Sequence, residues 1–97
     1  SEIEEIENEI KRIMDEIKEL HLMIVSPEHI LFDGKVEAVT LPGSRGAFMV
    51  LPGHAPVVST LGEGVVRYRL KNQEEDITGK GGFVEVNNDE MSVCVEV

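Results

Sequence analysis

The fold class that the sequence predicts is mostly β: an N-terminal coiled-coil α-helix followed by an antiparallel β-sandwich. Over the first 20 residues, apolar side chains recur at spacings of three and four, which is the period of a helix. From residue 21 the period changes to two, in short runs rich in valine and isoleucine. Because 97 residues suffice for one core, we expect a helix over residues 1–20 and a single sandwich domain over residues 21–97.

The helical segment carries one apolar seam with heptad spacing. Its members are Ile3, Ile6, Ile10, Ile13, Ile17 and Leu20. Ser1 and Glu4 have the spacing of a capping box, which favours a helix start at the first residue. Isoleucine at both core positions favours three or four strands over two, so the seam predicts a homo-oligomer, with a trimer favoured. The alternative is that the same stripe packs against the following domain as an ordinary amphipathic helix.

Short alternating runs follow the helix and predict strands. They are LMIVSP, KVEAVTLP, GVVRYRL, GFVEV and MSVCVEV. The pair Asp33-Gly34 is typical of a hairpin turn, and residues 87–89 predict a second turn between two of the runs. Arg67 and Arg69 alternate with apolar residues and are expected to face solvent. With no helical crossover between so many strands, we expect antiparallel sheets packed face to face or partly rolled into a barrel.

Composition excludes several classes of protein. The formal net charge of −10 argues against a nucleic-acid surface, which needs clustered cations. No apolar run approaches the roughly 20 residues of a membrane span, and no signal peptide opens the chain, so we expect a soluble, intracellular protein. The single cysteine, Cys94, cannot form an internal disulfide and is expected to be a small buried hydrophobe.

No local motif indicates catalysis, a metal or a cofactor. The serines lack a nucleophile elbow, and the three histidines, His21, His29 and His54, show no metal-ligand spacing. The glycines of residues 62–64 and 79–82 do not match a phosphate-binding loop and indicate turns or bulges. We therefore expect no catalytic, cofactor-binding or metal-binding residues from the local motifs.

Three segments carry a family resemblance that spans the whole β half. They are IVSPEHILFDGKVEAVTLPG, FMVLPGHAPVVSTLGEGVV and GGFVEVNNDEMSVCVE. From about Leu22 to Val97 the sequence resembles the N-terminal β-sandwich domain of the epsilon subunit of bacterial F-type ATP synthase. The first 20 residues lie outside this pattern, and their regularity is similar to that of engineered isoleucine-zipper tags, so we interpret them as an added segment.

The resemblance implies a non-catalytic subunit of the central stalk that links the gamma subunit to the c-ring. The implied role of such a subunit is to help couple proton transport to ATP synthesis, at the cytoplasmic face of the bacterial inner membrane. The resemblance places Ser26, His54 and Ser59 toward gamma, with His54 held on a stiff turn between Pro52 and Pro56. It places toward the c-ring a loop made of Gly43, Ser44, Arg45, Gly46 and Ala47.

Two departures from the family pattern bear on function. Many members carry acidic residues in the c-ring-facing loop, where this sequence has Arg45 and Ala47. Most members also continue into two C-terminal helices that brake ATP hydrolysis, whereas this sequence stops at Val97. We therefore expect a domain that couples without braking.

Two other functions remain open at this stage, because a β-sandwich alone does not define function. One is a free-standing carbohydrate- or peptide-binding module, which would need an exposed aromatic platform; the sequence offers one tyrosine, three phenylalanines and no tryptophan. The other is a small hydrolase, for which no local constellation is present.

Overall fold

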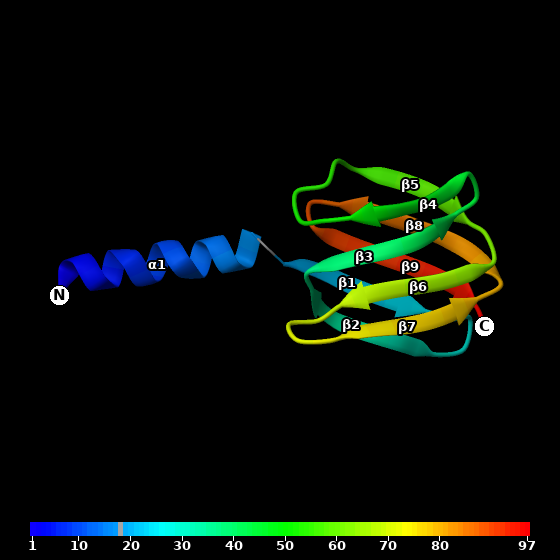
Figure 1. Cartoon of the computed structure of the whole chain (residues 1–97), viewed down its shortest axis with the longest axis horizontal. Helices are drawn as coiled ribbons and strands as arrows, with labels where there is room; N and C mark the ends of the chain where they lie inside the picture. Colours follow the sequence, from blue (N-terminus) through cyan, green and yellow to red (C-terminus); the bar gives the residue numbers. More distant parts are fainter. Residues whose placement is uncertain (18) are drawn as a thin grey trace.

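The computed structural model describes residues 1–17 and 19–97, with side chains described outside residues 14–18. The described residues form one helix, α1 (Glu2–Ile17), and nine strands. In chain order the strands are β1 (Leu20–Val25), β2 (Ile30–Val36), β3 (Ala38–Gly43), β4 (Gly46–Val50), β5 (Val57–Leu61), β6 (Gly64–Arg69), β7 (Glu74–Gly79), β8 (Gly81–Asn87) and β9 (Glu90–Glu96). The mostly β fold class is confirmed (Figure 1).

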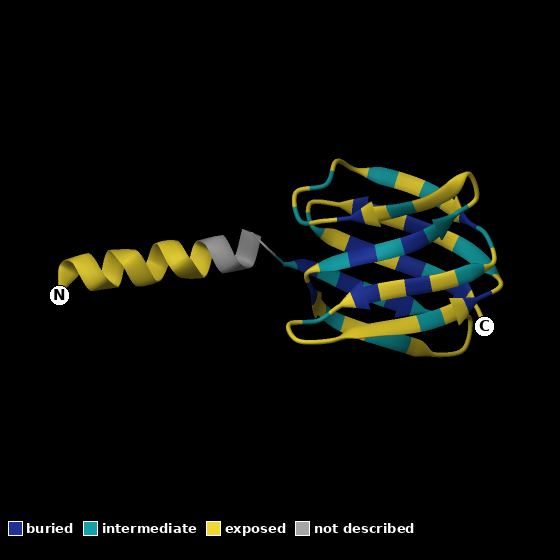
Figure 2. Cartoon of the chain, in the orientation of Figure 1, coloured by how far each residue is buried: buried dark blue, intermediate teal, exposed yellow. Residues whose placement is uncertain are grey.

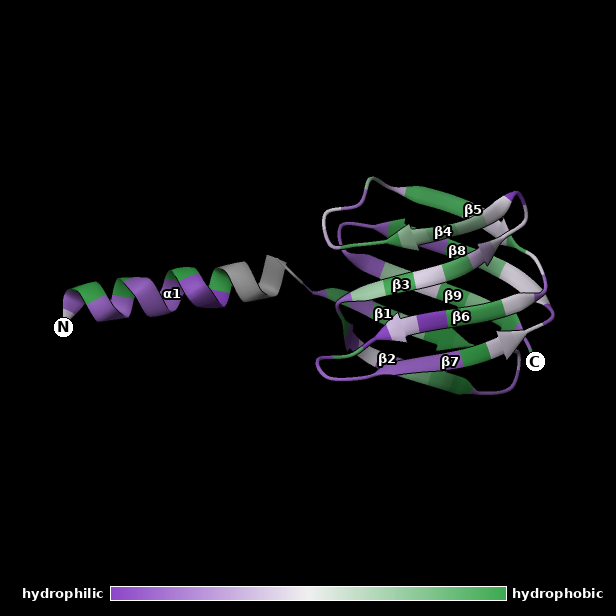
Figure 3. Cartoon of the chain, viewed as in Figure 1, coloured by the Kyte–Doolittle hydropathy of each residue, from purple (hydrophilic) through white to green (hydrophobic). Residues whose placement is uncertain are grey.

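Helix α1 begins with the predicted capping box. The Ser1 hydroxyl accepts a hydrogen bond from the Glu4 amide at 3.4 Å, and the Glu4 carboxylate accepts one from the terminal amine at 3.4 Å. The seam isoleucines whose side chains are described remain between 50% and 69% exposed: Ile3, Ile6, Ile10 and Ile13. The sandwich does not cover this stripe, which leaves it open along the helix (Figures 2 and 3). The side chain of Ile17 lies outside the described residues.

Leu20 does not belong to the helical seam, which corrects the predicted seam and domain boundary. Helix α1 ends at Ile17, and Leu20 is the first residue of β1, paired with Val36 of β2. Its side chain is fully buried in the sandwich core. Leu20 fits the heptad spacing, yet it also fits the alternation of LHLMIV, and burial in the core decided between the two. The sandwich therefore begins one residue earlier than the periodicity predicts.

The strands form one curled sheet whose two halves pack face to face. The order is β2-β1-β9-β8-β5-β3-β6-β7, and β4 pairs with β3. Strands β5 and β3 share only the pair Gly43 and Leu61, so the sheet folds over at this point into two layers (Figure 1). Neighbouring pairs are antiparallel as predicted, except that β1 runs parallel to β9. The parallel pair arises because β1 enters beside a strand that lies about 70 residues later in the chain.

The core lies between the two layers and follows the alternation of the strands. Its fully buried members are Leu20, Leu22, Ile24, Leu41, Met91, Val36, Val39, Val50, Val66, Val84, Val86 and Val93. The rings of Phe32 from β2 and Tyr68 from β6 meet with centroids 4.4 Å apart and join the layers on the side away from β5. Burying these side chains supplies the main driving force for folding.

One predicted turn is confirmed and the other is wrong. Asn88 and Asp89 have φ of 50° and 59° and make the tight turn between β8 and β9. Asp33 and Gly34, by contrast, lie inside β2, opposite Met23 and Leu22. An added Cβ at Gly34 would lie 3.1 Å from the Phe32 ring, a tight contact that the ring would have to relieve by a small shift. The hairpin from β1 to β2 turns instead at residues 26–29.

Candidate interaction surfaces

The loop between β4 and β5 holds His54 in a stiff turn, as predicted. The His54 amide donates to the Leu51 carbonyl at 3.1 Å, and its ring nitrogen Nδ1 lies 2.7 Å from the Ala55 carbonyl oxygen. Gly53, with φ of 83°, adopts a conformation that favours glycine and donates its amide to the Asp89 carboxylate at 2.7 Å. The loop is thus tied to the β8–β9 turn, 36 residues away in sequence.

Ser26 and Ser59 do not lie together with His54 in one cluster. Ser26 sits after β1, at the end of the sandwich opposite to the His54 loop, and its amide and hydroxyl bond the His29 backbone. Ser59 lies between them on β5, in the half-buried row that alternates with exposed Val58 and Thr60. Its hydroxyl donates to the Thr60 carbonyl at 3.2 Å. The three residues predicted to face gamma are therefore spread along the length of the sandwich.

The loop predicted to face the c-ring is the turn from β3 to β4. It lies at the same end of the sandwich as Ser26, since Gly43 pairs with Leu61 and Leu61 with Gly82 at the start of β8. The Ser44 hydroxyl lies 2.9 Å from the Thr60 hydroxyl, and the Ser44 amide donates to the Thr60 carbonyl at 3.2 Å. These bonds fix the turn against β5, and Arg45 at its tip is exposed.

The outer face of β6 and β7 carries a small network of ion pairs, in which Arg67 also lies 4.0 Å from Glu74. Arg67 donates to both carboxylate oxygens of Asp76, at 2.8 and 3.1 Å, and Arg69 donates to Glu74 at 2.8 Å. The hydrogen bond from Arg67 lowers the pKa of Asp76 below its usual value. Both arginines face solvent as predicted, and their cross-strand pairing accounts for their place on this face.

An apolar patch on the outer face of β1, β9 and β8 was not predicted from the sequence. Val25, Pro27, Phe83 and Cys94 line a hollow of about 320 Å³, and the Phe83 side chain is 50% exposed. Cys94 is half-buried on this outer face, which corrects the expectation of a buried thiol. The signal was present in the alternation, because Cys94 falls in register with Phe83 and out of phase with buried Val93 and Val95.

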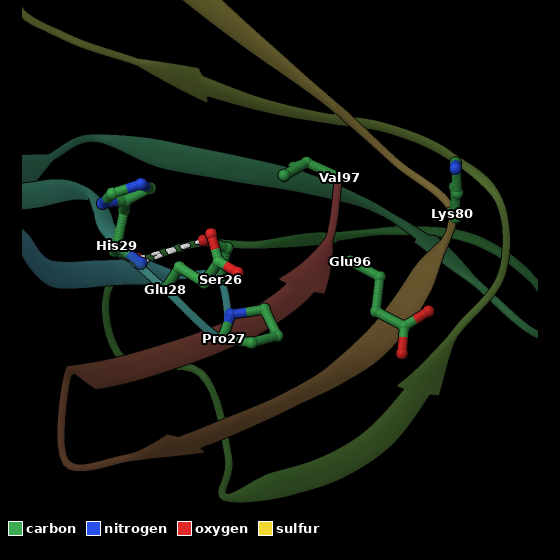
Figure 4. Close-up of a pocket in the computed structure, with 7 residues that line it drawn as sticks. All are labelled: Ser26, Pro27, Glu28, His29, Lys80, Glu96 and Val97. Atoms are coloured by element: carbon green, nitrogen blue, oxygen red, sulfur yellow. Dashed lines mark hydrogen bonds between the residues drawn. The ribbon is translucent and has the colours of Figure 1, made fainter.

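A second, more polar hollow of about 370 Å³ adjoins this patch at the end of β9 (Figure 4). Its lining residues are Ser26, Pro27, Glu28, His29, Lys80, Glu96 and Val97. Within it, the His29 amide donates to the Ser26 hydroxyl at 3.2 Å. The hydroxyl is thereby engaged with its own turn, and the hollow brings together charges of both signs.

Among the described side chains, those of residues 1–13 and 19–97, no group of three or more histidine, cysteine, aspartate or glutamate residues is arranged to hold a metal ion. Within residues 1–17 and 19–97, no helix is long and apolar enough to cross a membrane. The features that distinguish the surface are a pinned loop, a fixed turn and an apolar sheet face.

Comparison with known proteins gives the family. The family described as "ATP synthase, Delta/Epsilon chain, beta-sandwich domain" matches residues 19–97, and the chain belongs to it. The match begins one residue before β1 and leaves out the helix, in agreement with the burial of Leu20.

Curated relatives cover the same part of the chain. An ATP synthase epsilon chain of Leptospira borgpetersenii is 42% identical over 77 residues, which are 79% of this chain and 61% of the relative. A chloroplastic epsilon chain of Galdieria sulphuraria is 41% identical over 76 residues, covering 78% and 55%. The chain thus spans about 60% of the length of the relatives it matches.

Solved structures share the fold. A chain of the Euglena gracilis mitochondrial ATP synthase, in a structure of OSCP, F1 and c-ring, superposes with a TM-score of 0.76 at 21% identity, covering 80% of this chain and 51% of that one. A chain of the Tetrahymena thermophila mitochondrial ATP synthase, in a structure of the central stalk and c-ring, gives 0.67 at 15% identity, covering 80% and 63%.

Proposed function

We propose that the sandwich is a non-catalytic part of the central stalk of a bacterial F-type ATP synthase, where it links the gamma subunit to the c-ring and so helps couple proton transport to ATP synthesis. The observation that carries the proposal is the family match over residues 19–97, which covers every strand. The domain would be peripheral, at the cytoplasmic face of the inner membrane.

The His54 loop suits docking to gamma because it is already ordered. A surface that is rigid before binding loses less conformational entropy when it docks. Since the Ala55 carbonyl can only accept, His54 Nδ1 carries the proton of that bond, and a neutral ring then offers Nε2 as an acceptor to a partner. Ser26 and Ser59 would extend the contact along the sandwich, with the half-buried Ser59 contributing at its edge.

The β3–β4 turn suits contact with the c-ring because Ser44 and Thr60 fix its shape. Arg45 brings a positive charge to the tip of the turn. A contact made through Arg45 would favour a partner loop that offers carboxylates or carbonyls, since guanidinium groups pair best with such acceptors.

The alternative of a carbohydrate- or peptide-binding module finds less support. Such a module would need neighbouring exposed aromatic rings, yet Phe32 and Tyr68 pack against each other between the layers. Among the described aromatic side chains, Phe83 is the one that is half exposed.

We expect His54→Ala to weaken binding to purified gamma subunit by about tenfold, the order of loss seen when one interface anchor is truncated. The hydrogen bond of its side chain is made within its own loop, so the fold should remain intact. Isothermal titration calorimetry measures the change, and Lys71→Ala, an exposed substitution in the β6–β7 loop, is the control. Equal affinities for the two folded variants would contradict the role of His54.

We also propose that α1 self-associates through its exposed isoleucines, with a trimer favoured. Ile6→Lys combined with Ile10→Lys should give a monomer in sedimentation equilibrium, because two lysines would be buried in the seam. Glu5→Gln combined with Asn8→Lys changes the net charge equally on the opposite face and should leave the mass unchanged. A wild-type chain of monomeric mass would refute the proposal.

A further inference from the structure

His21 lies between two carboxylates at the start of β1. Its ring nitrogen Nδ1 is 2.7 Å from Glu90 Oε2 on β9, and Nε2 is 2.7 Å from Asp33 Oδ1 on β2. The imidazole therefore spans three adjacent strands, with β1 in the middle. None of the functions proposed above uses this cluster.

The geometry specifies the charged form of the ring. A carboxylate can only accept hydrogen bonds, so both ring nitrogens must carry a proton for both contacts to form. A neutral imidazole has one proton and would turn a lone pair toward one of the two carboxylates. The hydrogen bond to Asp33, and then that to Glu90, accordingly raise the pKa of His21 above 6.5.

The same residue is joined to the His54 loop through the β8–β9 turn. The His21 amide donates to the Asp89 carbonyl at 2.9 Å, and the Asp89 carboxylate accepts from the Gly53 amide at 2.7 Å. Glu90, which holds Nδ1, is the next residue after Asp89. Asp89 in this turn thus bonds both the His21 backbone and the His54 loop, while the next residue, Glu90, bonds the imidazole.

We infer that His21 is a protonation-controlled clasp: the imidazolium ties β2 to β9 and steadies the β8–β9 turn that anchors the 51–56 loop, and loss of its proton loosens that anchor. The effector is the hydrogen ion. The responding element is the Gly53–Asp89 contact, so the device links solution pH to the order of the loop that carries His54.

Other charges near the imidazole act on the same equilibrium. On β2, Asp33 favours the charged ring, while exposed Lys35, which is in register with His21, opposes it. Glu90 on β9 favours it, and the Asp89 carboxylate in the turn adds negative charge while bound to Gly53. Glu19, two residues earlier, is the flanking charge on the chain itself.

The sign of the pH effect follows from the raised pKa. The stabilisation is fully present below the unfolded value, near 6.5, and is lost as pH rises through the higher folded value. For each unit by which the folded pKa exceeds the unfolded one, the equilibrium constant for opening the clasp changes by about tenfold. The loop should therefore be most ordered in weakly acidic solution.

Two measurements on the full chain test the clasp. NMR titration of the imidazole nitrogens should give His21 a pKa above 6.5. Amide hydrogen exchange, corrected for the intrinsic pH dependence, should show protection of Gly53 falling as pH rises through that value. In His21→Gln the fall should disappear. The inference would be overturned if the protection of the Gly53 amide did not change with the protonation of His21, or if the pKa of His21 were not above 6.5.

Charge-neutral variants of the partners sharpen the test. Asp33→Asn and Glu90→Gln should each lower the pKa of His21. In each variant the pH at which Gly53 protection is lost should fall by as much as the pKa of His21 falls. Lys35→Gln removes a neighbouring positive charge instead of a negative one, so it should not lower the pKa of His21. Protection of Val93 in the core verifies that each variant is folded. If the pKa moves while Gly53 protection stays in place, the clasp does not control the loop.

Discussion

Replacing Gly82 with alanine is expected to destabilise the sandwich by about 3 kcal/mol or more, because the new side chain would meet backbone that cannot yield. Gly82 has φ of 153°, and a Cβ built there overlaps the carbonyl oxygen of Cys94. It would also lie 2.9 Å from the Cys94 carbonyl carbon and 3.1 Å from Val95 Cα. Both atoms belong to β9, which is hydrogen-bonded to β8, so relief requires the two strands to separate. Urea unfolding followed by circular dichroism measures the loss.

Gly62→Ala is the matched control for this substitution. The nearest atom to a Cβ at Gly62 is the Pro42 carbonyl oxygen at 3.8 Å, an ordinary contact, and the Gly62 amide can still donate to that oxygen. We expect a change within about 1 kcal/mol. Equal losses for the two variants would show that the close approach of β8 and β9 does not constrain residue 82.

The strands predicted correctly from the sequence are those whose alternation is complete within a few residues. Strands β6, β8 and β9 each bury every second side chain and face solvent with the others, so the pattern is local. Strand β2 was missed because Asp33-Gly34 resembles a turn. Asp33 lies inside the strand because it bonds His21 of β1, 12 residues away in the chain. A local pattern cannot report that contact.

The same distinction applies to the surface. The stiffness of the His54 loop was predictable because Pro52, Gly53 and Pro56 restrict their own backbone. Its anchor was not, because Asp89 is brought to Gly53 by the pairing of β5 with β8, which sets Val57 opposite Val86. The orientation of Ser59 depends on register, which places it opposite buried Val84. Interactions between distant segments therefore mark the limit of what the sequence predicts for this surface.

Leu20→Ala is expected to cost about 2–5 kcal/mol of unfolding free energy, the range for removing a large buried side chain. Leu20 is fully buried at the start of β1, within the family match, and its loss leaves a cavity between the layers. The prediction distinguishes two possible roles of Leu20, in the helical seam or in the sandwich core, which the heptad spacing alone does not separate. A seam leucine would stabilise the chain only through association, whereas a core leucine stabilises each copy by itself.

Ile13→Ala gives the comparison, because Ile13 is a described seam residue that is 50% exposed in the single chain. Stability that arises from association depends on protein concentration, while stability of the core does not. Thermal unfolding of the sandwich over a dilution series should show Leu20→Ala lowering the midpoint equally at every concentration. Ile13→Ala should change only the concentration dependence. If Leu20→Ala instead acts only at high concentration, residue 20 belongs to the helical seam and the sandwich begins after it.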